Sequence, residues 1–230
     1  MQNNIQGVAF DLDGTLYPNY RLNIRLLPFI IKEWRLLAAF GKARNFIRKE
    51  QTENKSIFPH ADFYTYQAEI TAKFLSAKTE IIKEKIDRLM YRGWEPLFKK
   101  VKVYKGARDL LDELHKSGFK LGLLSDFPPE RKLEYMDIDN CWDSVLCSET
   151  CGALKPHSVS FIELAKEMSL PPENILYVGN SYSYDVEGAA AVGMKTAWLK
   201  PLPCSCPGKK SPVPDFSFTS YRQLYKFLLL

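Results

Sequence analysis

The chain lacks a long uninterrupted apolar run, and this absence argues against a membrane span. Its most apolar stretch, residues 24–40, is interrupted by Arg25, Lys32, Glu33 and Arg35. That stretch therefore predicts an amphipathic helix, either buried or lying at the surface. The first residues also lack the apolar region of a secretory signal peptide. Together these absences predict a water-soluble, cytoplasmic protein.

Cysteine is scarce, with five residues that have no regular spacing. An odd, irregular set does not form a disulfide framework and is typical of proteins in a reducing cytoplasm. Cys204 and Cys206 lie close together, but the second ligand pair of a zinc site is missing, so no metal site is expected there. Internal repeats and low-complexity segments are also absent.

The overall composition is that of an ordinary globular protein, with 46% hydrophobic and 26% charged residues. The net charge of +5 is unevenly placed, because residues 21–105 carry +10 and the remainder carries −5. A basic segment attracts anionic substrates, acidic surfaces or nucleic acid, and a solvated helical face explains it equally well. No basic and aromatic motif has a readable spacing, so no nucleic-acid partner is expected.

Short apolar segments alternate with segments of helical periodicity over most of the chain. Strands are expected at residues 5–10, 120–124, 145–147, 175–178 and 196–199, and helices at 107–116, 158–168 and 186–192. A last strand and helix are expected within residues 216–229. This alternation predicts an α/β fold in which helices cover both faces of a parallel sheet.

Residues 19–103 depart from this alternation and show helical periodicity only, as in Leu27, Ile30, Trp34 and Leu37. We therefore expect an inserted helical unit, with residues 1–18 and 104–230 forming the α/β core. Ligands of open α/β sheets bind beyond the carboxyl ends of the strands. Three polar residues that follow predicted strands are expected to converge there: Asp11, Ser125 and Asn180.

Two carboxylates, Asp11 and Asp13, directly follow the first predicted strand. Paired acids suit metal binding or acid/base chemistry, although an Asp-rich turn also serves simply to bind backbone amides. The chain resembles the haloacid dehalogenase superfamily in four segments that occur in the family's order. These segments are DLDGTL at 11–16, LLS at 123–125, KP at 155–156 and VGNSYSYDVEGA at 178–189. The resemblance implies a Rossmann-like, doubly wound parallel sheet with an inserted α-helical cap.

The resemblance also implies a magnesium-dependent phosphatase and assigns roles to four residues. Asp11 is the nucleophile that forms an aspartyl-phosphate, and Asp13 is the general acid and base. An acid at position 13 separates the phosphatases of the family from its dehalogenases. Ser125 donates a hydrogen bond to the phosphate, and Lys155 supplies a positive charge beside Asp11.

Mg²⁺ is the implied cofactor, held by Asp11, the backbone carbonyl of Asp13, Asn180 and Asp185. The family usually has Asp where this chain has Asn180. An amide oxygen still suits magnesium, but the site loses a negative charge and, we expect, some metal affinity.

The function predicted is hydrolysis of a small phosphorylated metabolite. Two alternatives remain open: a phosphosugar mutase with the same core chemistry, and a noncatalytic binding or regulatory protein on the same fold. The cap is expected to select the substrate, a sugar, nucleotide or organic acid phosphate, through its Lys, Arg, Trp and Tyr residues. Trp94 is expected to serve in packing, and His60 is given no role.

Overall fold

The computed structural model describes residues 4–54, 62–201 and 212–230; His60, Cys204 and Cys206 lie outside them. Its centre is a six-stranded, entirely parallel sheet in the order β3-β2-β1-β4-β5-β6. The strands are β1 (Gly7–Phe10), β2 (Lys120–Ser125), β3 (Ser144–Cys147), β4 (Ile175–Gly179), β5 (Lys195–Leu199) and β6 (Phe216–Phe218). The predicted α/β class is confirmed.

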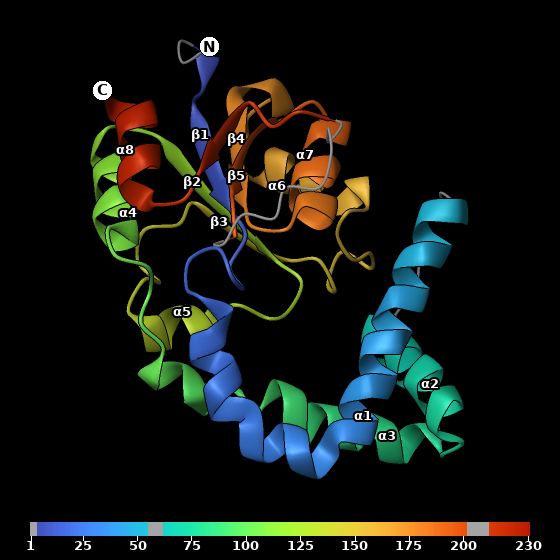
Figure 1. Cartoon of the computed structure of the whole chain (residues 1–230). Helices are drawn as coiled ribbons and strands as arrows, with labels where there is room; N and C mark the ends of the chain where they lie inside the picture. Colours follow the sequence, from blue (N-terminus) through green and yellow to red (C-terminus); the bar gives the residue numbers. More distant parts are fainter. Residues whose placement is uncertain (1–3, 55–61, 202–211) are drawn as a thin grey trace.

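Helices cover both faces of the sheet, as the alternation of segments predicts. Helices α4 (Ala107–Lys116) and α8 (Tyr221–Leu229) lie on one face, and α6 (Ser158–Glu167) and α7 (Glu187–Ala191) lie on the other (Figure 1). Side chains alternate along each strand, so Val8 and Phe10 belong to one core while Ala9 belongs to the other. Because β1 is buried on both faces, its sequence is apolar throughout.

Three local features differ from the expected pattern. The short helix α5 (Glu130–Met136) follows β2 where no helix is expected. The helix expected at 186–192 consists of a π-helix, η5 (Tyr182–Val186), continued by α7. A 3₁₀ turn, η4 (Pro172–Asn174), also precedes β4. Seven-residue helices and single π turns have too few residues for a periodic apolar pattern to show.

The described residues between β1 and β2 are mainly helical, and most of these helices lie outside the layers of the sheet and its covering helices (Figure 1). This part of the chain comprises α1 (Asn19–Asn54), α2 (Phe63–Leu75), α3 (Thr79–Ile86), the π-helix η2 (Asp87–Tyr91) and the 3₁₀ helix η3 (Glu95–Lys100), followed by α4. Helix α1 runs through Pro28 and has non-helical backbone angles at Glu33. In the part of the chain that the structure describes, no helix is both long and apolar enough to cross a membrane.

The helical segments before α4 have a small core of their own, in which α2 packs against both α1 and α3. Leu36, Phe40, Ala68, Ile82 and Ile86 are buried together there. The second half of α1 also contacts the sheet domain, because Gln51 donates to the carbonyl of Gly152 at 2.9 Å and accepts from the amide of Leu154 at 3.1 Å. These bonds tie the helical insertion to the loop that precedes Lys155.

Candidate active site

Three charged side chains meet at the carboxyl end of β1. Asp11 directly follows the strand, and its amide donates to the carbonyl of Val178 on β4 at 2.9 Å. The ammonium of Lys155 donates to Asp11 Oδ1 at 2.7 Å and to Asp185 Oδ1 at 2.8 Å. All three residues are buried, although 144 and 30 positions of sequence separate Lys155 from its two partners. The parallel sheet therefore brings the first, third and fourth sequence segments into direct contact.

Burial and the opposite charge of a neighbour act against each other on the pKa values of Asp11 and Lys155. Burial raises the pKa of Asp11 to about 7; the charge of Lys155 opposes the shift, and Asp185 adds to it. Burial disfavours the charged form of Lys155, but Asp11 and Asp185 together raise its pKa above the ordinary value. Two carboxylates thus share one ammonium, and the group carries a surplus of negative charge when all three are ionised.

Asn180 lies close to this group through Thr15. The Thr15 hydroxyl donates to Asp11 Oδ2 at 2.7 Å and lies 3.1 Å from Asn180 Oδ1. Gly14, with φ of +96°, makes this approach feasible, because a Cβ there would lie 2.5 Å from Asn180 Nδ2. Gly179 serves the same purpose for Asp185, whose Cβ would lie 2.3 Å from a Cβ at position 179. Gly14 thus lets the first and fourth segments pack in contact, and Gly179 lets the fourth segment fold back on itself.

The donor set at this edge fits a hard divalent cation in chemistry and charge. It offers the carboxylates of Asp11 and Asp185 and the amide oxygen of Asn180, all oxygen ligands of the kind that Mg²⁺ prefers. Within the described residues, no three His, Cys, Asp or Glu side chains are grouped to hold a metal. This agrees with an amide at position 180, where a carboxylate would have been the third acid.

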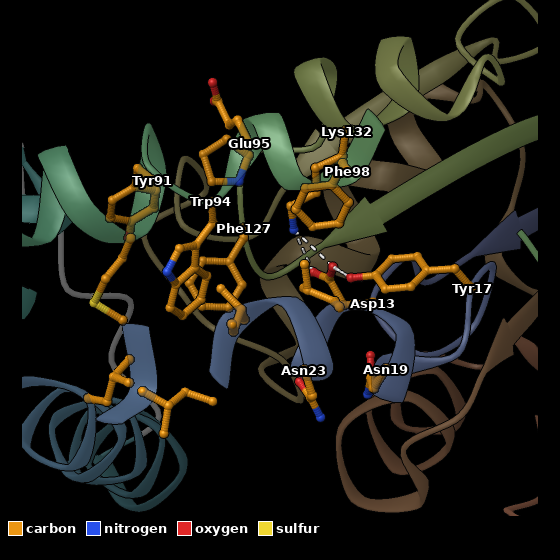
Figure 2. A pocket seen from close by; sticks show the side chains of 16 residues that line it. Asp13, Tyr17, Asn19, Asn23, Tyr91, Trp94, Glu95, Phe98, Phe127 and Lys132 are labelled. Atoms are coloured by element: carbon orange, nitrogen blue, oxygen red, sulfur yellow. Dashed lines mark hydrogen bonds and ion pairs between the residues drawn. The ribbon is translucent and has the colours of Figure 1, made fainter. Parts of the chain in front are cut away.

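Asp13 points to a different side of the site, where Lys132 and Tyr17 bind it (Figure 2). The Lys132 ammonium donates to the two carboxylate oxygens at 2.9 and 2.7 Å, and the Tyr17 hydroxyl donates to Oδ1. The Ser125 hydroxyl, itself fully buried, lies 3.5 Å from Asp13 Oδ2. The structure thus places Ser125 and Asp13 side by side.

Lys132 is a site residue that sequence reasoning missed. It lies on α5, and 119 positions separate it from Asp13 in the sequence. Neither a motif nor a strand end marks it, because it is one of many lysines in the chain and lies on a helix that was not expected. Only the tertiary structure identifies it as the partner of Asp13.

Asp126, next to Ser125, belongs to a second buried cluster of charges. Its carboxylate accepts from Arg48 at 2.5 Å, from the Ser148 hydroxyl at 2.6 Å and from the Lys155 amide at 3.1 Å. Burial alone would raise its pKa, but Arg44, Lys155 and Arg48 hold the pKa of Asp126 well below its usual range. Asp126 therefore joins the segment at 123–125 to the backbone of Lys155.

A cavity of about 440 Å³ adjoins Asp13 and extends toward the helical insertion (Figure 2). It is lined by α1, η2, η3 and the loop after β2, with Asp13, Tyr17 and Lys132 at the polar end. Trp94 lies on its wall, besides packing against the core.

Sequence comparison places the whole site within one family. The model for haloacid dehalogenase-like hydrolases matches residues 5–193. Over 98 residues the chain is 35% identical to a glyceraldehyde 3-phosphate phosphatase of Pyrococcus abyssi, and that match spans 41% of each protein. It is 25% identical to the enzyme of that name from Methanopyrus kandleri, over 96% of this chain and 95% of the relative. A phosphoglycolate phosphatase of Salmonella paratyphi A is 27% identical, over 85% of this chain and 81% of its own.

Structure comparison gives the same fold. A phosphatase of the family from Thermococcus onnurineus has a TM-score of 0.65 at 24% identity, with 98% of each chain covered. A dehalogenase solved with an intermediate complex has a TM-score of 0.71 at 17% identity, with both chains fully covered. Similarity at these identities establishes the fold alone. The match of the family model to residues 5–193, with the fold it implies, shows that the chain belongs to the haloacid dehalogenase-like hydrolases.

Proposed function

We propose that this hydrolase cleaves phosphate monoesters through a phosphoryl group carried on Asp11. One observation carries the proposal: the buried Asp11 carboxylate lies in contact with Lys155, two residues before a second acid that faces a cavity. Relatives aligned over most of this chain are named as phosphatases, which supports the same reaction class. The substrate is a small phosphorylated molecule.

In the first step, an Asp11 oxygen attacks phosphorus, and the bond from phosphorus to the ester oxygen breaks. Asp13 gives its proton to that departing oxygen, so that a neutral alcohol leaves. The Lys132 ammonium and the Tyr17 hydroxyl donate to the Asp13 carboxylate and hold it beside the cavity.

In the second step, water attacks the aspartyl-phosphate and Asp13 accepts its proton. Inorganic phosphate leaves, and the Asp11 carboxylate is restored. We assign Ser125 as a hydrogen-bond donor to a phosphate oxygen, because its hydroxyl lies beside Asp13. Lys155 holds Asp11 in place and offsets negative charge as the phosphate approaches.

Magnesium is the cofactor that fits this donor set, held by Asp11, Asp185, Asn180 and the carbonyl of Asp13. When bound, it offsets negative charge on the transferring phosphoryl group. Lys155 alone does not neutralise that charge together with the charges of Asp11 and Asp185. Asp13 takes part through its backbone in this assignment, because its side chain is directed to Lys132.

Release of phosphate from acetyl phosphate and 4-nitrophenyl phosphate tests the proposal. We expect turnover with Mg²⁺, its loss with a chelator, and a decrease of roughly 10⁴-fold or more in Asp11→Asn. Asp109→Asn, a matched change at an exposed position on α4, should leave turnover unchanged. Borohydride reduction followed by peptide mass spectrometry should find the acyl phosphate at residue 11. A folded wild-type protein that releases no phosphate from a broad panel would contradict the proposal.

A further inference from the structure

The cavity beside Asp13 has walls that are mainly apolar. Helix α1 contributes Leu22, Leu26 and Ile30 to them, and the segment from η2 to η3 contributes Met90 and Phe98. The aromatic rings of Trp94 and Phe127 lie along the wall between Asp13 and Tyr91 (Figure 2). A space of about 440 Å³ falls within the range of small-molecule sites, and such walls stabilise apolar surface removed from water.

The charges along this cavity disfavour an anionic occupant. Lys132 is the one cation among its lining residues, and Asp13 already occupies that ammonium through both carboxylate oxygens. Glu95 and Asp13 place two acids on the same walls. A carboxylate entering here would lose its water of hydration, would face the two acids and would find the one ammonium of the lining already paired.

The polar groups of the cavity are few and mostly gathered at the end near Asp13. Asn19 and Asn23 on α1 lie there, close to Tyr17 (Figure 2). Farther from Asp13, the indole nitrogen of Trp94 is buried and has no hydrogen-bond partner among the described residues. Such a distribution fits a molecule with one polar end at Asp13 and a large apolar body.

We infer that the substrate is a phosphate monoester of an uncharged, mainly apolar alcohol, such as an aryl or other bulky hydrocarbon alcohol. The inference rests on the proposed function and specifies its leaving group. The phosphate lies at Asp11, the ester oxygen faces Asp13, and the apolar body fills the space between α1, Trp94 and Phe127. Phosphoglycolate and glyceraldehyde 3-phosphate leave most of these walls without contact, so they are poor substrates.

A pair of adjacent isoleucines on α1 gives a matched test. Ile30 lines the cavity, whereas Ile31 is 75% exposed and does not line it. Ile30→Asp and Ile31→Asp therefore introduce the same charge into the same helix, on different sides. The substrates compared are 1-naphthyl phosphate, 2-phosphoglycolate and glyceraldehyde 3-phosphate. Exchange of oxygen between inorganic phosphate and water is measured in parallel, since it requires Asp11 chemistry but no alcohol.

We expect the wild-type kcat/KM for 1-naphthyl phosphate to exceed that for either small substrate by roughly 100-fold. We expect Ile30→Asp to lower the kcat/KM for 1-naphthyl phosphate about tenfold, after division by the oxygen-exchange rate of the same protein. Ile31→Asp should match the wild type. With exchange intact, a preference for a small substrate, or equal effects of the two substitutions, would overturn the inference and leave the proposed function standing.

Absence of exchange in the wild type would instead count against the proposed function. Calorimetry then measures the affinities of the Asp11→Asn protein for 1-naphthyl phosphate and 2-phosphoglycolate. This comparison tests the preference of the cavity for an apolar ligand independently of catalysis. Tighter binding of the naphthyl compound, weakened by Ile30→Asp, would support the inference. Equal or reversed affinities would overturn it.

Discussion

Two buried clusters of charged side chains lie near the same edge of the sheet, and they differ in their balance of charge. In the first, Lys155 alone faces Asp11 and Asp185. A surplus carboxylate in a buried place favours a further cation. The composition of this cluster therefore supports the proposed cation site.

The second cluster pairs Arg44 and Arg48 with Asp126 and Glu149, so its charges match in number. Arg44 also donates to Gln67 on α2 at 2.8 Å, and Arg48 donates to the carbonyl of Lys155 at 3.0 Å. Its cations come from α1 and its acids from loops of the sheet domain. A balanced, fully hydrogen-bonded group of this kind fixes the relative position of two parts of a protein.

The largest expected effect comes from unbalancing the second cluster. Arg44→Met leaves Glu149 and Asp126 without their buried guanidinium, and we expect a loss of about 3–5 kcal/mol in the free energy of unfolding. Urea denaturation measures it. Arg92→Met is the matched control: Arg92 pairs with Asp87 at the surface, 68% exposed, so its removal should cost about 1 kcal/mol or less. Equal losses in the two variants would show that the Arg44 cluster does not stabilise the fold.

The two clusters also differ in how far the sequence reveals them. Asp11, Lys155 and Asp185 are predictable because each belongs to a segment with a recognisable order, and strand ends of a parallel sheet meet at one edge. Arg44 and Arg48 are not, since their contacts with Glu149 and Asp126 span 105 and 78 positions and follow no local periodicity. Lys132 escapes prediction for the same reason.

Fold prediction shows a similar division. The apolar, doubly buried segments that became β1, β2 and β4 are visible in the sequence, because burial on both faces requires continuous hydrophobicity. The periodicity of residues 24–40 predicts the helix that became part of α1, but the non-helical backbone at Glu33 is not visible, because no glycine or proline marks that position. The cavity is lined in part by that helix, so the apolar walls of the cavity can be identified only from the structure.

A smaller effect should follow from satisfying the first cluster with its proposed cation. Mg²⁺ at about 100 times its dissociation constant should raise the free energy of unfolding by roughly 2.7 kcal/mol, because it binds the folded state. Thermal unfolding over a magnesium series measures this stabilisation. It should shrink in Asp185→Asn, which removes one of the proposed ligands. An equal magnesium response in Asp185→Asn and the wild type would place the ion elsewhere.

The smallest expected effect tests Asn180, the amide that leaves the first cluster one acid short. Asn180→Asp adds a carboxylate near Asp11, so Mg²⁺ should bind roughly tenfold more tightly, equivalent to about 1.4 kcal/mol. Without the metal, the same change adds a second surplus charge and should lower the melting temperature, since repulsion between buried carboxylates is then unrelieved. Calorimetric titration and thermal unfolding measure the two effects. Asn140→Asp, at an exposed position, should show neither. If Asn180→Asp left magnesium affinity unchanged, Asn180 would not be a ligand, and the charge deficit of the cluster would need a different explanation.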